Sequence, residues 1–134
     1  MSLFTEVHQI NIWVKDIKRS SKWYEEILGV ETLSDYGSTV MLNFPSSEST
    51  VICLIEVPGD HRLPYPDHSS IGTHPVFAIT PEYAETCKET LEEKEVEIVK
   101  GGGKAHFKFK DLDGNVLEAY LPGLYEKEEY EHLR

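Results

Sequence analysis

The chain has 134 residues, of which 40% are hydrophobic and 28% are charged, the size and composition of one soluble globular domain. Its net charge of -11 disfavours nucleic acid and anionic membrane surfaces as partners, because both reward clustered Lys and Arg. No segment approaches the roughly 20 apolar residues that span a bilayer, and no secretory signal is visible. Two cysteines, Cys53 and Cys87, are too few for a disulfide framework. We therefore expect a cytoplasmic protein with reduced thiols.

The first part of the chain, about residues 5–57, is typical of a βαβββ module. Alternating apolar and polar residues predict a strand from His8 to Val14. Asp16 predicts the N-cap of a helix and Gly29 predicts its C-terminal end, so a helix is expected between them. Three strands should follow, at about residues 30–35, 39–44 and 50–57.

A segment rich in Pro, Gly and Ser, residues 58–73, is the expected linker to a second module at residues 74–121. His74–Ile79 predicts a strand, and Thr80-Pro81 predicts the start of a helix with Ala84, Cys87 and Leu91 on one face. Further strands are expected at 95–100, 105–110 and 115–121, the last two joined by a hairpin turn at 111–114, and an acidic, helical tail at 122–134.

The two modules present equivalent histidines. The shift that carries His8 onto His74 also carries Val30-Glu31 onto Val96-Glu97, as expected of a duplicated unit. Glu118, on the last predicted strand, adds a carboxylate to these two imidazoles. Two imidazoles and one carboxylate are the ligand set of open divalent-metal sites that leave positions for substrate.

Three segments of the chain resemble the vicinal oxygen chelate superfamily, which includes glyoxalase I, extradiol dioxygenases, fosfomycin-resistance enzymes and bleomycin-binding proteins. They are VHQINIWVKDIKRSSKWYEEILGVE, GTHPVFAIT and FKDLDGNVLEAY. The resemblance implies an α+β fold in which two βαβββ modules form a curved mixed sheet around a metal cleft. It also implies His8, His74 and Glu118 as the metal ligands. Strand alternation places Tyr120 on the same face as Glu118, beside the metal.

One position departs from the four-ligand relatives such as glyoxalase I, which carry a further Glu on the last strand of the first module. Here Cys53 falls at that position, and Glu56, three residues on, should point to the opposite face. Cys53, or Glu56 through a bulge, is the alternative fourth ligand. Classical glyoxalase I activity is therefore disfavoured.

We therefore expect an enzyme that uses Mn²⁺, Fe²⁺, Ni²⁺ or Zn²⁺ to act on a small substrate chelated through vicinal oxygens, as a lyase, thiol transferase or dioxygenase. The candidate catalytic groups are His106 and Tyr120, while His61, His68 and His132 are interpreted as surface or hydrogen-bonded residues. The alternative is a metal-free binding protein of the bleomycin-resistance type, which the acidic charge favours. Small two-module relatives usually pair, so a homodimer is expected.

Overall fold

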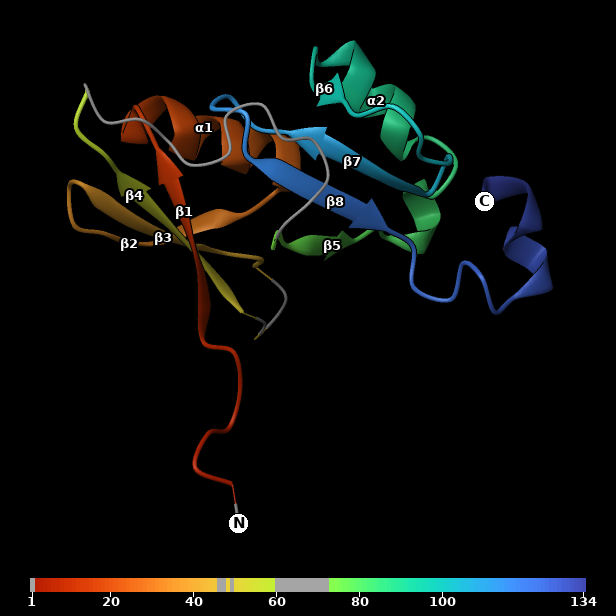
Figure 1. Cartoon of the computed structure of the whole chain (residues 1–134), viewed down its shortest axis with the longest axis horizontal. Coiled ribbons are helices and arrows are strands. Elements are labelled where there is room, and N and C mark those ends of the chain that lie inside the picture. Colours follow the sequence, from red (N-terminus) through yellow and green to blue (C-terminus); the bar gives the residue numbers. More distant parts are fainter. Residues whose placement is uncertain (1, 46–47, 49, 60–72) are drawn as a thin grey trace. The chain divides into compact units, whose positions relative to one another are not determined.

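The computed structural model describes residues 2–45, 48, 50–59 and 73–134, and the chain divides into two compact units, residues 1–64 and 65–134. Each unit contains one four-stranded mixed sheet (Figure 1). No helix in the described part of the chain is long and apolar enough to cross a membrane.

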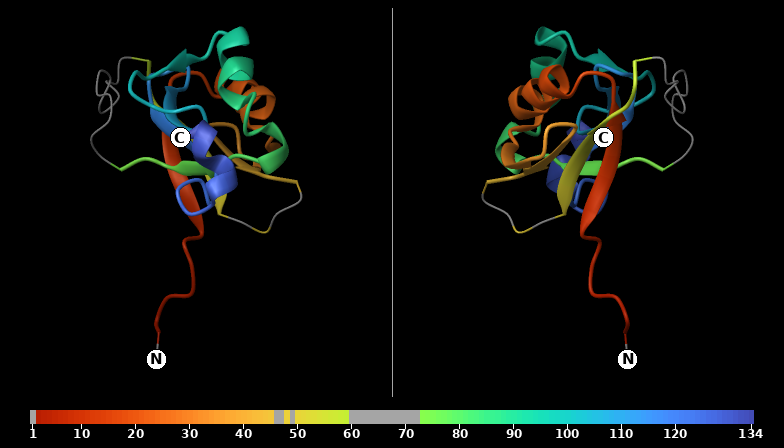
Figure 2. Two further views of the ribbon diagram at one scale, coloured as in Figure 1. Left: turned by 90° about the vertical axis from the view of Figure 1, so that its right-hand side faces the viewer. Right: turned by 90° about the vertical axis from the view of Figure 1, so that its left-hand side faces the viewer.

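Unit 1 has the strand order β1-β4-β3-β2, with β1 parallel to β4 and the other neighbours antiparallel. Helix α1 packs against β4, β2 and β3 (Figure 2). The fully buried side chains of this unit include Tyr24, Leu42 and Leu54. The elements are β1 (Gln9–Val14), α1 (Ile17–Leu28), β2 (Glu31–Asp35), β3 (Thr39–Asn43) and β4 (Val51–Glu56).

Helix α1 has the boundaries that its end residues predict. Asp16 has extended backbone angles, and its side chain accepts a hydrogen bond of 3.1 Å from the N–H of Arg19, which makes it the N-cap. Gly29 ends the helix with φ 77°, a left-handed conformation that glycine adopts without strain, and its N–H donates to the carbonyl of Glu25. Both local predictions are confirmed.

Unit 2 has the strand order β5-β8-β7-β6, with β5 parallel to β8. This order repeats that of unit 1 strand for strand, so the predicted fold class, α+β with two βαβββ modules, is confirmed. The elements are β5 (Val76–Ala78), η1 (Pro81–Tyr83), α2 (Cys87–Glu93), β6 (Glu97–Ile98), β7 (His106–Lys110), β8 (Val116–Tyr120) and η2 (Glu128–Leu133).

The helix expected after Pro81 differs from the prediction. A 3₁₀ turn, η1, comes first, and the α-helix begins only at Cys87. The predicted apolar face nevertheless persists, because Ala84 and Leu91 are buried and Cys87 is half-buried. The tail forms the 3₁₀ helix η2, and Leu133 within it is buried. The tail is therefore packed into unit 2 and is not only a solvated acidic segment.

Candidate functional site

The hairpin of β7 and β8 positions the candidate site in unit 2. Its turn is held by Asp111, whose Oδ1 accepts hydrogen bonds of 2.9 Å from the N–H groups of Asp113 and Asn115. This turn sets the register in which Lys108 lies opposite Glu118. On its other side, β8 pairs with β5, which starts two residues after His74. The register therefore brings His74 beside Glu118.

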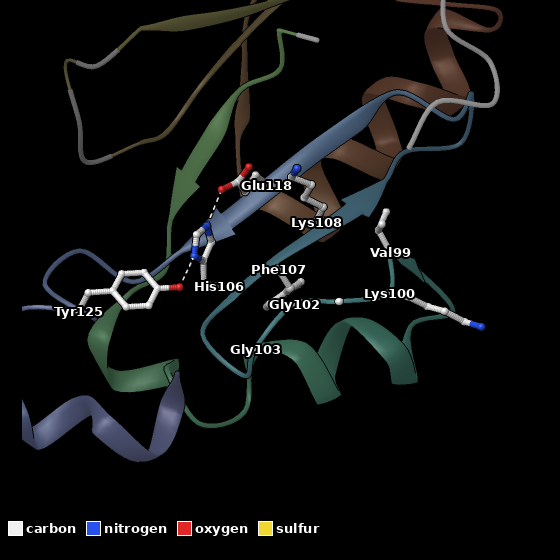
Figure 3. Close-up of a pocket in the computed structure, with 10 residues that line it drawn as sticks. Val99, Lys100, Gly102, Gly103, His106, Phe107, Lys108, Glu118 and Tyr125 are labelled. Carbon is white, nitrogen blue, oxygen red and sulfur yellow. Dashed lines mark hydrogen bonds and ion pairs between the residues drawn. The ribbon is translucent and has the colours of Figure 1, made fainter. Parts of the chain in front are cut away.

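The carboxylate of Glu118 contacts two imidazoles. Its Oε1 lies 2.6 Å from Nε2 of His74, and its Oε2 lies 2.6 Å from Nε2 of His106. The side chains of His74 and Glu118 are only 17% and 14% exposed. Figure 3 shows the imidazole of His106 pointing at the carboxylate. Two of the three predicted metal ligands, His74 and Glu118, thus belong to the same unit and are in direct contact.

The pKa of Glu118 reflects opposing effects. Desolvation of the half-buried carboxyl acts to raise its pKa, but the hydrogen bonds from His74 and His106 outweigh it and hold the pKa below its ordinary value. Glu118 is therefore ionised at neutral pH. A carboxylate ligand has to be ionised to bind a metal ion.

Tyr125, which follows β8, also contacts His106, and the sequence did not predict this contact. Its hydroxyl oxygen lies 2.6 Å from Nδ1 of His106, as the dashed line in Figure 3 marks. Tyr120 stacks on Tyr125, with ring centroids 6.2 Å apart, and meets His106 edge-on at 5.1 Å. The candidate residue Tyr120 therefore belongs to an aromatic group around His106.

A pocket of about 590 Å³ opens beside this group, within the range of sites for small molecules. The segment Gly101–Gly103 passes along it (Figure 3). A Cβ added at Gly102 would lie 2.6 Å from Cβ of Phe107 and 2.8 Å from the carbonyl oxygen of His106, so only glycine fits against β7 there. The polar side chains that line the pocket include Lys100, His106, Lys108, Glu118 and Tyr125.

His8 lies in unit 1, immediately before β1, which begins at Gln9. Its carbonyl accepts a hydrogen bond from the N–H of Val51, and its Nδ1 lies 3.1 Å from Oε1 of Gln9. His74 and Glu118 belong to unit 2, so the complete set of three ligands remains a prediction. Among residues 2–45, 48, 50–59 and 73–134, no group of three His, Cys, Asp or Glu side chains has an arrangement that would hold a metal ion. His74 and Glu118 are thus two donors that need a third.

The two alternatives for a fourth ligand have other contacts. Oε2 of Glu56 accepts a hydrogen bond of 2.8 Å from the N–H of Ile17, at the start of α1. Cys53 is only 3% exposed, and burial raises the pKa of its thiol. These contacts favour structural roles for both residues. His132 pairs with Glu85 at 2.9 Å, and neither residue lines the pocket. His61 and His68 lie outside the described residues.

The family model described as the Glyoxalase/Bleomycin resistance protein/Dioxygenase superfamily matches residues 6–119, and the chain belongs to this superfamily. The resemblance seen in the sequence is therefore confirmed. The metallothiol transferase FosB of Staphylococcus epidermidis is 29% identical over 131 residues, which cover 94% of this chain and 88% of that protein.

Solved structures share the fold at lower identity. A trypanothione-dependent glyoxalase I of Leishmania major has a TM-score of 0.72 and 23% identity, over 96% of this chain and 95% of that one. The fosfomycin resistance protein FosX of Listeria monocytogenes has a TM-score of 0.68 and 19% identity, over 92% and 98%. At these identities the likeness supports the fold, and the activity has to be argued from the site.

Proposed function

We propose that the protein is a divalent-metal-dependent enzyme whose small substrate is chelated through vicinal oxygens, with His8, His74 and Glu118 as the metal ligands. The observation that carries the proposal is the 2.6 Å approach of Nε2 of His74 to Oε1 of Glu118. Both side chains are half-buried, and Glu118 also lines the pocket. A metal ion held there would therefore have a substrate-sized space beside it.

The donor atoms fit such an ion. Imidazole nitrogen and carboxylate oxygen suit Mn²⁺, Fe²⁺, Ni²⁺ and Zn²⁺. Two donors that bind one ion at about 2.1 Å each lie roughly 3 Å apart, so the contact between His74 and Glu118 needs to open only slightly. The ion would take the place of the proton that the pair now shares. When bound, it supplies a Lewis acid that polarises a substrate oxygen.

Thiol transfer is the reaction type that we favour, because the metallothiol transferase FosB, at 29% identity, is more similar in sequence to this chain than the glyoxalase I and FosX described above, at 23% and 19%. In such a reaction a thiol sulfur bonds to an electrophilic carbon, a C–O bond of the electrophile breaks, and its oxygen takes up the proton that the thiol loses. Lys108 in the pocket wall would favour an anionic electrophile. His106 and Tyr120 remain the candidate catalytic groups, and lyase or dioxygenase chemistry on the same ligands is the alternative.

A second candidate is a metal-free protein that sequesters a cationic small molecule. It is favoured by the net charge of -11 and by the aromatic group of His106, Tyr120 and Tyr125, since cations bind well against aromatic rings. The close contact of His74 with Glu118 gives the metal-dependent function the stronger support.

We further propose that the protein is a homodimer in the cytoplasm, as is common among two-module relatives. Light scattering after gel filtration measures the oligomeric state.

Elemental analysis after purification without chelator tests the proposal. We expect close to one divalent ion per chain, and its loss in His8→Ala and in His74→Ala. His132→Gln removes the histidine of an exposed His–Glu pair that does not line the pocket, and this variant should keep the ion. Absence of metal, together with no rise in melting temperature on adding any of the four ions, would contradict the metal-dependent function. The metal-free binding protein would then be the favoured function.

A further inference from the structure

We infer that His106 and Tyr125 are positioning residues that orient Glu118 for metal binding, an inference that rests on the proposed metal site. Tyr125 holds His106, His106 holds one carboxylate oxygen of Glu118, and the other oxygen is left to the metal ion. The three side chains form one continuous chain of contacts, each 2.6 Å long.

The direction of these hydrogen bonds follows from which groups can donate. An ionised carboxylate only accepts, so Nε2 of His106 carries the hydrogen that it donates to Oε2 of Glu118. A neutral imidazole with its hydrogen on Nε2 has an acceptor at Nδ1. The hydroxyl of Tyr125 therefore donates to Nδ1 of His106 and stabilises the tautomer that Glu118 requires.

This arrangement divides the two oxygens of Glu118 between two tasks. Oε2 accepts from His106, whereas Oε1 faces Nε2 of His74, the other proposed ligand in unit 2. The carboxylate is thereby held in an orientation that offers a single oxygen to the ion. Partners of this kind orient metal ligands and usually change metal affinity about 10- to 100-fold when they are removed.

The backbone around His106 is also closely constrained. The carbonyl of His106 accepts a hydrogen bond of 2.8 Å from the N–H of Gly103. Gly102 packs so closely on His106 and Phe107 that it has no room for a Cβ. The ring itself lies edge-on to Tyr120 and Tyr125, at centroid distances of 5.1 and 5.6 Å. The loop and the aromatic rings thus limit the positions that the imidazole can take.

The test measures the dissociation constant for Zn²⁺ by competition with a chromophoric chelator. His106→Leu, which removes both hydrogen bonds, should weaken binding about 10- to 100-fold. His106→Gln should restore most of that loss, because the amide nitrogen of glutamine reaches the place of Nε2 and can donate to Glu118. Tyr125→Phe should weaken binding several-fold in the wild-type background but not in the His106→Gln background, where Nδ1 is absent.

Two controls and a spectrum separate positioning from a general structural effect. His132→Gln alters a histidine that pairs with a glutamate outside the pocket lining. Tyr83→Phe alters a tyrosine of the same unit that is about as exposed as Tyr125. Both variants should bind Zn²⁺ as the wild type does. The absorption spectrum of bound Co²⁺ should shift in His106→Leu and return towards that of the wild type in His106→Gln, while the melting temperature of the metal-free protein changes little.

The outcomes distinguish this inference from the proposed function. If His74→Ala loses Zn²⁺ while His106→Leu and Tyr125→Phe bind it as tightly as the wild type, the inference is overturned and the metal site stands. An equal effect of Tyr125→Phe in both backgrounds would show that Tyr125 does not act through His106, which also overturns it. A wild-type protein that binds no ion contradicts the proposed function itself.

Discussion

Glu56, the last residue of β4, caps the first residue of α1, because its Oε2 accepts a hydrogen bond of 2.8 Å from the N–H of Ile17. The first amides of a helix have no partner within the helix, and negative charge is stabilising at this end. Asp16 satisfies the amide of Arg19, so two carboxylates share the N-terminus of α1. The contact links the last strand of unit 1 to its helix.

Glu56→Ala should therefore destabilise the protein by about 1 kcal/mol, the usual cost of losing a helix cap, as measured by urea unfolding. Glu26→Ala, at an exposed position of the same helix, serves as the control and should have little effect. The metal content of Glu56→Ala should equal that of the wild type. A loss of bound metal in this variant would instead make Glu56 a ligand.

Gly102→Ala should destabilise unit 2 by roughly 1–3 kcal/mol, the usual cost of overpacking. The added methyl group would lie 2.6 Å from Cβ of Phe107, so β7 or the loop has to shift. Gly59→Ala has nothing within 4 Å of the new Cβ and should be close to neutral. Thermal melting compares the two variants, and equal melting temperatures would contradict the close approach at Gly102.

Leu133→Ala should cost about 2–4 kcal/mol, because the side chain is only 2% exposed in η2 and its loss leaves a cavity. Leu112→Ala, at a 40% exposed position in the hairpin turn, is the matched control. Denaturant midpoints measure both changes. A neutral Leu133→Ala would mean that the tail does not pack against unit 2 in solution.

The two cysteine thiols should react slowly with a disulfide reagent at neutral pH. Burial raises the pKa of Cys53 and of Cys87, so less thiolate is present than in the unfolded chain. Cys87, which is half-buried, should react first. Single Cys→Ala variants assign each rate, and rapid reaction of Cys53 at neutral pH would point to an activated nucleophile in place of a buried structural thiol.

The same shifts set the sign of the pH dependence of stability. A folded-state pKa that lies above the unfolded value makes a contribution that is complete below the unfolded pKa. This contribution is lost as the pH rises through the folded pKa. The unfolding free energy should therefore fall at alkaline pH, and it should fall less in a variant with both cysteines replaced by alanine.

The sequence predicted best those features that neighbouring residues determine. Asp16 and Gly29 are adjacent to the ends of α1, and both ends were predicted correctly. The helix after Pro81 was predicted as continuous because no glycine or second proline marks an interruption. Its replacement by η1 and a later start at Cys87 depends on packing that apolar spacing does not reveal.

The candidate site divides in the same way. The internal repeat and the family resemblance singled out His74 and Glu118, which are in contact. Tyr125 was missed, because it lies 19 residues from its partner His106 in a segment without periodicity. Its role depends on a tertiary contact with His106. The sequence around Tyr125 gives no local signal that sets it apart from Tyr130, the other tyrosine of the tail.

The parallel pairing of β5 with β8 also has a consequence for folding kinetics. It joins the first and last strands of unit 2, and His74 and Glu118, brought together by it, are 44 residues apart in the chain. Contacts over such separations form late, because the entropy of closing the intervening chain is lost first. An ion held by this pair would stabilise the native state but not the folding transition state, because the two ligands are not yet together there. It should therefore slow unfolding and leave the refolding rate nearly unchanged. The protein with its ion would then resist proteolysis through a longer native lifetime.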